Sequence, residues 1–266
     1  MNPEELGSHV ADGTSFHFIG GTHLDLPTIC GLQITKFMVL EVLAALLMLL
    51  LFIPLARRIR TGEPVKGRFW NLLEVFLLFL RDEVVRPAIG HGADKFLPLV
   101  WTVFFFILFS NLFGMIPGGG SPTASLSVTG VMALTAFLAV VISGSIKLGV
   151  IKFWTSQVPH MDVPAVLGIV LKPMMFVIEV FGLLVKHFVL AIRLFANMFA
   201  GHLVLAVFTA FIGATAANLI VWCVVSFPSM AVIIAVDFLE LFVAFLQAYI
   251  FVFLMSLFIG MGSHPH

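Results

Sequence analysis

Five stretches of this 266-residue chain are apolar over about twenty residues or more, the length that an α-helix needs to cross the hydrocarbon core of a bilayer. Charged residues make up 11% of the chain, against about 25% in soluble domains, which excludes an ordinary soluble fold. The sequence predicts an all-α integral membrane protein with five transmembrane helices. The predicted spans are about 37–56, 97–116, 127–146, 173–213 and 218–261.

Two regions outside these spans carry many of the polar residues. Residues 1–36 are polar and lack a regular periodicity, so we expect an extramembrane N-terminal tail, followed by a single membrane domain over 37–266. Residues 67–90 predict an amphipathic helix that lies on the membrane surface, with a sixth span as the alternative. The charges that argue against a span there are Arg68, Glu74, Arg81, Asp82, Glu83 and Arg86.

Basic residues predict the orientation of the chain. They gather in the loops that follow the first and third spans, and the positive-inside tendency places both loops in the cytoplasm. With five spans, the N-terminal tail is then extracytoplasmic and the C-terminus is cytoplasmic. The residues concerned are Arg57, Arg58, Arg60, Lys66, Arg68, Lys147 and Lys152.

Ionisable side chains inside the last two predicted spans are the main functional signal. A charge at the bilayer centre costs about 2.5–3.5 kcal/mol on insertion scales, so such residues are rare and usually functional. Arg193 lies about twenty residues from either end of its apolar stretch, whereas Lys186 could reach an interface by extending its side chain. The polar set is Glu179, Lys186, Arg193, Asn197 and His202 in the fourth span and Asp237, Glu240 and Gln247 in the fifth.

The spacing of these residues predicts which of them share a helix face. Glu179, Lys186 and Arg193 follow one another at intervals of seven residues, and Asn197 comes one helical turn after Arg193. At 100° per residue, all four side chains lie in one narrow stripe. Such a stripe indicates a polar path along the fourth span.

An antiparallel hairpin of the last two spans brings the two polar sets together. One register sets Arg193 level with Gln247 and His202 level with Glu240. His202, however, lies on the opposite side of an ideal helix from Arg193. The register therefore requires a twist or kink near Gly201. We expect His202 and Glu240 to form one functional unit on the outer side of Arg193.

The length of the last two spans predicts an unusual tilt. The chain from Arg193 to the expected turn near residue 217 covers roughly 36 Å as an α-helix, whereas the whole hydrocarbon core is about 30 Å thick. If Arg193 lies near mid-depth, both helices must be strongly tilted. We therefore expect a long, tilted antiparallel hairpin.

Four sequence segments carry a resemblance to a known family. Five of the eight intramembrane polar residues lie in LAIRLFANMFAGH (190–202) and ELFVAFLQAYIF (240–251). The loop between the second and third spans is flanked by FSNLFGMIP (109–117) and SLSVT (125–129). Together with the charged surface segment, they resemble the a subunit of F-type ATP synthase over nearly the whole chain. His187 and the FANM sequence depart from the commoner proline and FGNM of that family.

The resemblance implies roles for the polar residues. Arg193 would be the essential arginine that faces the carboxylates of the rotating c-ring and separates two aqueous half-channels. Asn197 and Gln247 would be its polar neighbours, His202 and Glu240 the polar pair of the entry half-channel, and Glu179 a carboxylate of the exit half-channel. Lys186 and Asp237 complete the set that we assign to proton translocation.

The resemblance also implies partners and a location. The expected partners are the c-ring, subunit b of the peripheral stalk, the lipid bilayer and protons, without nucleic acid. The chain would have no catalytic site of its own, and neither a cofactor nor a metal is expected, since Cys30 and Cys223 lack ligands at metal-binding spacing. The location would be a bacterial inner membrane or, alternatively, the energy-transducing membrane of an organelle.

Three other functions are weighed against this one. A secondary transporter with an anion on Arg193 predicts internal repeats or broken helices, and neither is evident in the sequence. A structural anchor leaves the costly intramembrane charges unexplained. An intramembrane enzyme needs a nucleophile and base, or a metal site, and the histidines show no such grouping within the spans.

Overall fold

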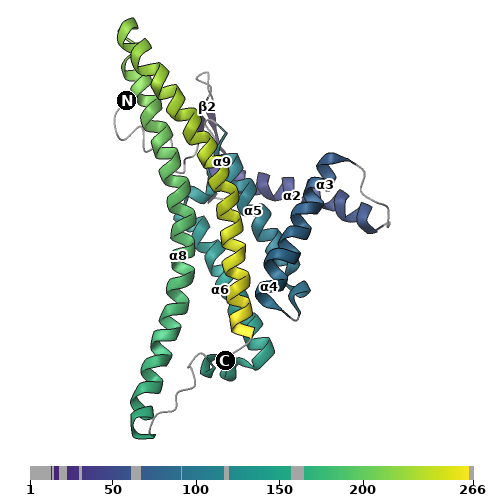
Figure 1. Ribbon diagram of the computed structural model, residues 1–266. Helices are drawn as coiled ribbons and strands as arrows, with labels where there is room; N and C mark the ends of the chain where they lie inside the picture. Colours follow the sequence, from purple (N-terminus) through teal and green to yellow (C-terminus); the bar gives the residue numbers. More distant parts are fainter. Residues whose placement is uncertain are drawn as a thin grey trace. The chain divides into compact units, whose positions relative to one another are not determined.

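A computed structural model describes residues 13, 15–17, 23–29, 32–60, 67–90, 92–116, 120–156 and 165–263 (Figure 1). The chain forms two compact units, which are described separately below. Unit 1 comprises Met1–Val65, Phe105–Thr129 and Arg193–Ala248, and unit 2 comprises Lys66–Phe104, Gly130–Ile192 and Tyr249–His266.

Five helices of the described chain are long and apolar enough to cross a membrane, which confirms the predicted number of spans. They are α2 (Lys36–Arg60), α5 (Leu97–Gly114), α6 (Leu126–Leu148), α8 (Ala165–Ala214) and α9 (Leu219–Ser263). A helix satisfies all its interior backbone groups within one segment, so it is the form that an apolar run takes in lipid. The all-α membrane fold predicted from the sequence is thus confirmed.

Helices α8 and α9 are each continuous, although each contains a proline. Pro173 lies inside the 50-residue α8, and Pro228 lies inside the 45-residue α9. At 1.5 Å per residue, these helices are about 75 Å and 68 Å long, more than twice the thickness of a hydrocarbon core. The predicted long helices are therefore present, and their tilt in a membrane stays a prediction.

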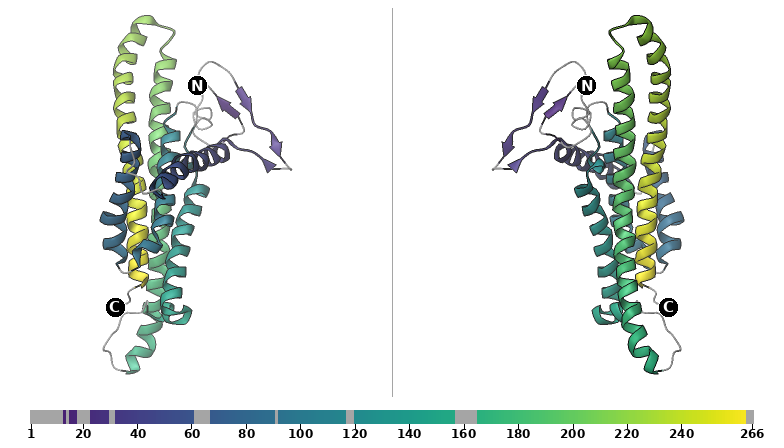
Figure 2. Two further views of the ribbon diagram at one scale, coloured as in Figure 1. Left: turned by 90° about the vertical axis from the view of Figure 1, so that its right-hand side faces the viewer. Right: turned by 90° about the vertical axis from the view of Figure 1, so that its left-hand side faces the viewer.

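A tight connection makes α8 and α9 an antiparallel hairpin. Asn218 supplies the N-cap of α9, because its side-chain Oδ1 accepts hydrogen bonds from the backbone N–H groups of Ile220 at 3.1 Å and Val221 at 3.4 Å. At the end of α8, the Thr215 hydroxyl donates to the carbonyl of Phe211 at 3.1 Å. The end of α8 and the start of α9, both in unit 1, lie side by side in both views of Figure 2.

The N-terminal tail contains four short strands that the sequence did not predict. Strand β1 (Ser15–His17) pairs with β2 (His23–Asp25), and β3 (Thr28–Ile29) pairs with β4 (Leu32–Gln33), both in the antiparallel sense. Strands of two or three residues are too short to produce a recognisable period in the sequence. Helix α2 begins directly after them, and the Lys36 backbone N–H donates to the carbonyl of Gly13 at 2.9 Å.

The predicted surface helix is an unbroken helical segment in unit 2. It consists of α3 (Arg68–Phe79), the π-helix η1 (Leu80–Val85) and α4 (Arg86–Ile89), and it does not belong to the five candidate spans. The segment ends at Gly90, whose φ of 73° favours glycine. The remaining short helices of the described chain are η2 (Ala93–Lys95), η3 (Pro122–Ala124) and α7 (Val150–Thr155).

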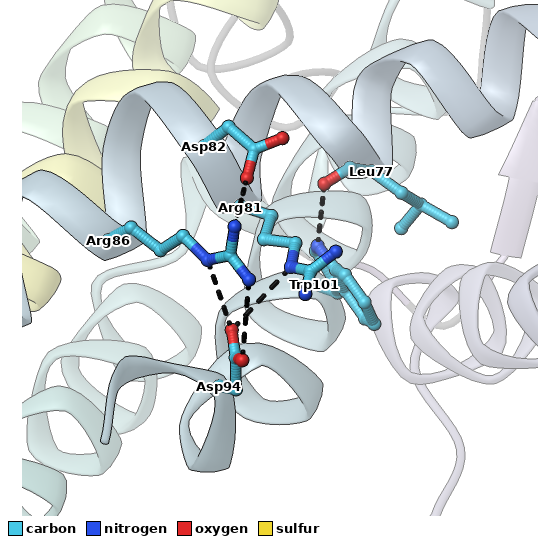
Figure 3. A network of polar contacts seen from close by, with 6 residues as sticks. All are labelled: Leu77, Arg81, Asp82, Arg86, Asp94 and Trp101. Atoms are coloured by element: carbon cyan, nitrogen blue, oxygen red, sulfur yellow. Dashed lines mark hydrogen bonds and ion pairs between the residues drawn. The ribbon is translucent and has the colours of Figure 1, made fainter. Parts of the chain in front are cut away.

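Figure 3 shows an ion-pair network on this segment. Arg86 contacts Asp82 at 2.9 Å and Asp94 at 3.3 Å, and Arg81 Nε lies 3.5 Å from Asp94. The hydrogen bond from Arg86 lowers the pKa of Asp94 below its usual value and raises that of Arg86. The Trp101 indole N–H donates to the Leu77 carbonyl at 3.2 Å, next to the π-helical turn where backbone hydrogen bonding changes register.

Candidate functional site

Arg193 projects from α8 with an exposed side chain. It makes neither a hydrogen bond nor an ion pair with any residue that the structure describes. Its neighbours Leu194 and Met198, 0% and 3% exposed, form the packed face of this helix within unit 1. The guanidinium therefore faces outward from its own unit, in the interior of an apolar helix of candidate membrane-spanning length.

Asn197 and Gln247 connect the two helices of the hairpin one turn beyond Arg193. The Asn197 side-chain amide donates to Gln247 Oε1 at 2.9 Å. Gln247 is 2% exposed, and its Nε2 is buried without a hydrogen-bond partner in the described chain. The sequence set Gln247 level with Arg193, whereas the structure pairs it with Asn197, which lies on the same helical stripe.

Glu240 packs against Gly201. The carboxylate is 5% exposed, and a Cβ atom on Gly201 would overlap Glu240 Oε1. Because Gly201 has no side chain, α8 leaves room at this position for the carboxylate of α9. Glu240 Oε1 has no hydrogen-bond partner among the described residues.

His202 points toward the end of α5 instead of forming a hydrogen bond with Glu240. A Cβ atom on Gly114 would lie 3.0 Å from His202 Nε2, and this nitrogen is buried without a hydrogen-bond partner in the part of the chain that the structure describes. Buried polar groups normally have a partner, either protein or water. His202 and Glu240 thus occupy adjacent positions in unit 1, and each retains the capacity to bond water or a proton.

A chain of buried polar groups in unit 1 extends from the loop after α5 to α9. Ser121 and Thr123 share a 2.7 Å hydrogen bond between their hydroxyls, and Thr123 donates to Asn111 Oδ1 at 2.5 Å. The Asn111 amide in turn donates to the carbonyl of Ala244 at 3.4 Å. The Ser121 hydroxyl also donates to the carbonyl of Ser110 at 3.2 Å, so it links the loop after α5 to the end of that helix.

Three predicted site residues remain, one in unit 1 and two in unit 2. Asp237 is partly exposed on α9 and has no side-chain partner among the described residues. In unit 2, Glu179 is partly exposed, and the exposed Lys186 extends over the ring of Phe258, with its Nζ 5.9 Å from the ring centroid. Both belong to the predicted stripe on α8, and their surroundings are described within unit 2 only.

Sequence reasoning missed several buried polar residues. Those in the α5 network are Ser110, Asn111, Ser121 and Thr123, all 0% exposed. Lys36 and His187, each 4% exposed, were also not assigned to the site. The His187 ring packs between the rings of Phe137 and Phe258, with centroid distances of 5.3 Å and 5.1 Å. The available signal was the polar sequence SN inside an otherwise apolar span end, FSNLFGMIP.

The site therefore combines an outward-facing guanidinium with a buried carboxylate, a half-buried imidazole and amides, on one hairpin of apolar helices. A model of the family described as ATP synthase A chain matches residues 38–260. The chain belongs to this family. The resemblance inferred from the sequence is thereby confirmed.

Individual relatives agree with the family. "ATP synthase subunit a 2" of Chlorobaculum tepidum is 37% identical over 96% of this chain and 71% of that protein. "ATP synthase subunit a" of a Methylobacterium species is 41% identical over 77% of this chain and 79% of that protein. "ATP synthase subunit a" of Chloroherpeton thalassium is 35% identical over 98% of this chain and 78% of that protein. A member of the ATP synthase A chain family with five apolar helices is a multi-pass membrane protein.

Proposed function

We propose that the chain is the stator subunit of a rotary ATP synthase and provides two offset half-channels that carry protons to and from carboxylates of the c-ring. Arg193 separates the half-channels and couples proton flow to rotation. The observation that supports this proposal best is the exposed Arg193 side chain, unpaired within the described chain and located inside an apolar helix. A charge so costly to place in lipid requires a partner, and a carboxylate on a neighbouring subunit is the simplest one.

The guanidinium accounts for the coupling in electrostatic terms. Arginine stays charged in proteins, so Arg193 favours the anionic form of any ring carboxylate that faces it. The carboxylate releases its proton on approach and takes up another after passing. The same positive charge repels protons, so they cannot pass directly between the half-channels. Rotation of the ring is then the only route across the membrane.

Glu240 and His202 form the entry half-channel in this proposal. Both side chains carry buried polar atoms that have no hydrogen-bond partner in the described part of unit 1. Both types of side chain can take up and release protons, and a histidine does so near neutral pH. The polar chain from Ser121 to Asn111 lines the same end of unit 1 and supplies further groups for water. Glu179 contributes a carboxylate to the exit half-channel, and Lys186 and Asp237 complete the set of residues that serve proton translocation.

The same proposal extends to partners and orientation. The c-ring faces Arg193, and subunit b of the peripheral stalk holds the chain still while the ring turns. The chain lies in a bacterial inner membrane with its N-terminus outside and its C-terminus in the cytoplasm, as its basic loops predict. The chain itself carries no catalytic site, and ATP chemistry takes place in other subunits of the complex.

The test is ATP-driven proton pumping by inverted membrane vesicles that contain the Arg193→Ala variant. We expect pumping to be lost while the complex assembles in normal amount. Arg193→Lys should also lose most of the activity, because a lysine lacks the planar fork of donors. Lys172→Ala removes an exposed charge near the start of the same helix and should pump normally. Normal pumping by Arg193→Ala would contradict the proposal.

A further inference from the structure

A groove in unit 2 lies outside the proton-translocation site. It is a cavity of about 780 Å³ between the start of α5 and the second half of α6. Phe96 and Leu99 line one wall, and Leu138 and Ile142 line the other. Leu138 and Ile142 are 46% and 54% exposed, so no other part of the described chain covers this wall.

Positive charge marks one end of the groove. The two charged residues that line it are Lys95, at the end of η2 and two residues before α5, and Lys147, in the last turn of α6. Since α5 begins where α6 ends, both lysines lie at the same end of the helix pair. The nearby carboxylate of Asp94 is engaged by Arg81 and Arg86. The residues that line this end of the groove thus include two basic side chains and no acidic one.

The length of the groove distinguishes between possible occupants. The lining residues of α6 run from Thr135 to Lys147, which corresponds to roughly 18 Å of helix. One leaflet of the hydrocarbon core is about 15 Å thick, whereas a spanning helix of a partner protein needs the full thickness of about 30 Å. An apolar groove as long as one leaflet, with cations at one end only, matches the shape of a phospholipid.

We propose that this groove binds one anionic phospholipid of the leaflet in which α6 ends. Lys95 and Lys147 contact the headgroup phosphate, and an acyl chain lies along Phe96, Leu99, Leu138 and Ile142. Basic residues near a membrane surface each strengthen binding to anionic lipid about fivefold. This site holds the start of α5 and the end of α6 together through a lipid, and it is independent of the proton-translocation role of Arg193.

Photocrosslinking of the intact complex tests the site. The purified complex is placed in phosphatidylcholine nanodiscs that contain a small fraction of phosphatidylglycerol with a diazirine on its acyl chain. After irradiation, mass spectrometry locates the modified peptides. We expect labelling around 96–99 and 138–142. A diazirine analogue of phosphatidylcholine should label these segments several times less.

Two pairs of variants separate the effect of the lysine charges from the effect of the groove's shape. The double variant Lys95→Gln with Lys147→Gln should reduce labelling by phosphatidylglycerol about tenfold or more, whereas Lys152→Gln, which changes an exposed lysine outside the groove, should not. Ile142→Trp should fill the groove and reduce labelling by both lipids. Leu134→Trp, at a 53% exposed position of the same helix that does not line the groove, is its control.

Three results would overturn the proposal. Equal labelling by the two lipids would show that the lysines do not select the headgroup. Undiminished labelling of the double lysine variant, in complexes that assemble and melt like the wild type, would exclude them as its ligands. Crosslinking from a photoreactive amino acid at position 142 to another polypeptide, without lipid adducts, would show that a partner protein fills the groove.

Discussion

Asn197 on α8 donates a hydrogen bond to Gln247 on α9 at 2.9 Å, one helical turn beyond Arg193. This bond joins the two helices of the hairpin one turn from a guanidinium that has no partner among the described residues. The bond therefore ties to α9 the stretch of α8 that carries Arg193.

The first prediction concerns the energy of that contact. In a double-mutant cycle of Asn197→Leu and Gln247→Leu, we expect a coupling of about 0.6 kcal/mol, the average for interhelical hydrogen bonds in membrane proteins. The cycle is measured from the unfolding free energies of the four variants in detergent. Strictly additive effects would show that the two amides stabilise their helices independently.

A second prediction follows from the contact of Glu240 with Gly201. A methyl group at Gly201 would overlap the carboxylate, so Gly201→Ala should displace Glu240 and reduce ATP-driven proton pumping about ten- to hundredfold. Gly213→Ala is a matched control, because a Cβ atom at Gly213 on the same helix meets nothing within 4 Å. Combining Gly201→Ala with Glu240→Asp should restore part of the flux, since the shorter acid relieves the overlap. Equal activity of the two glycine variants would rule out this role for the contact.

The network around Asp94 predicts a pH dependence. Arg86 lowers the pKa of Asp94 in the folded protein, so the ionised carboxylate stabilises the fold above its unfolded pKa of about 4, and this stabilisation is lost as the pH falls through the lower folded pKa. Asp94→Asn should therefore lower the melting temperature slightly at pH 7, and the difference should vanish at a pH well below 4. Glu83→Gln, a nearby carboxylate outside the network, should show no such pattern. A difference that persists unchanged at low pH would contradict the assignment.

A fourth prediction concerns the tilt of the hairpin. Transmembrane helices tilt by about 20° on average, and helices as long as α8 and α9 fit within a bilayer only at a much larger angle. Spin labels placed every turn along α9 from 224 to 245 should report depths that change much less per residue than 1.5 Å. A depth change close to 1.5 Å per residue would show that the helix is upright.

Much of this fold could be predicted from the sequence because apolar runs in a membrane chain have few alternatives. The five spans and the hairpin of α8 and α9 follow from run length alone. The strands of the tail could not be predicted, since segments such as Thr28–Ile29 are shorter than any pattern that separates strand from loop.

Sequence spacing identifies the residues of the candidate site, whose role stays a prediction, but not the contacts between them. Spacing places Asn197 and Arg193 on one stripe, yet it sets the register of a hairpin only to about one turn. Side-chain length and direction then decide that Gln247 meets Asn197 and that Glu240 meets Gly201. Ser121 and Thr123 were not predicted, because a segment of proline, glycine and serine residues indicates only a connecting loop. The tertiary structure alone brings their hydroxyls into the network with Asn111.

The most direct test of the central proposal measures proton leakage when the ring cannot turn. Vesicles containing the complex are stripped of its catalytic sector, the ring is crosslinked to the stator, and a potassium diffusion potential is applied. With Arg193 present, we expect no proton flux through the locked complex, because the guanidinium repels protons between the half-channels. With Arg193→Ala, protons should pass although the ring is locked. If the locked Arg193→Ala complex is as tight as the wild type, Arg193 is not the barrier between the half-channels.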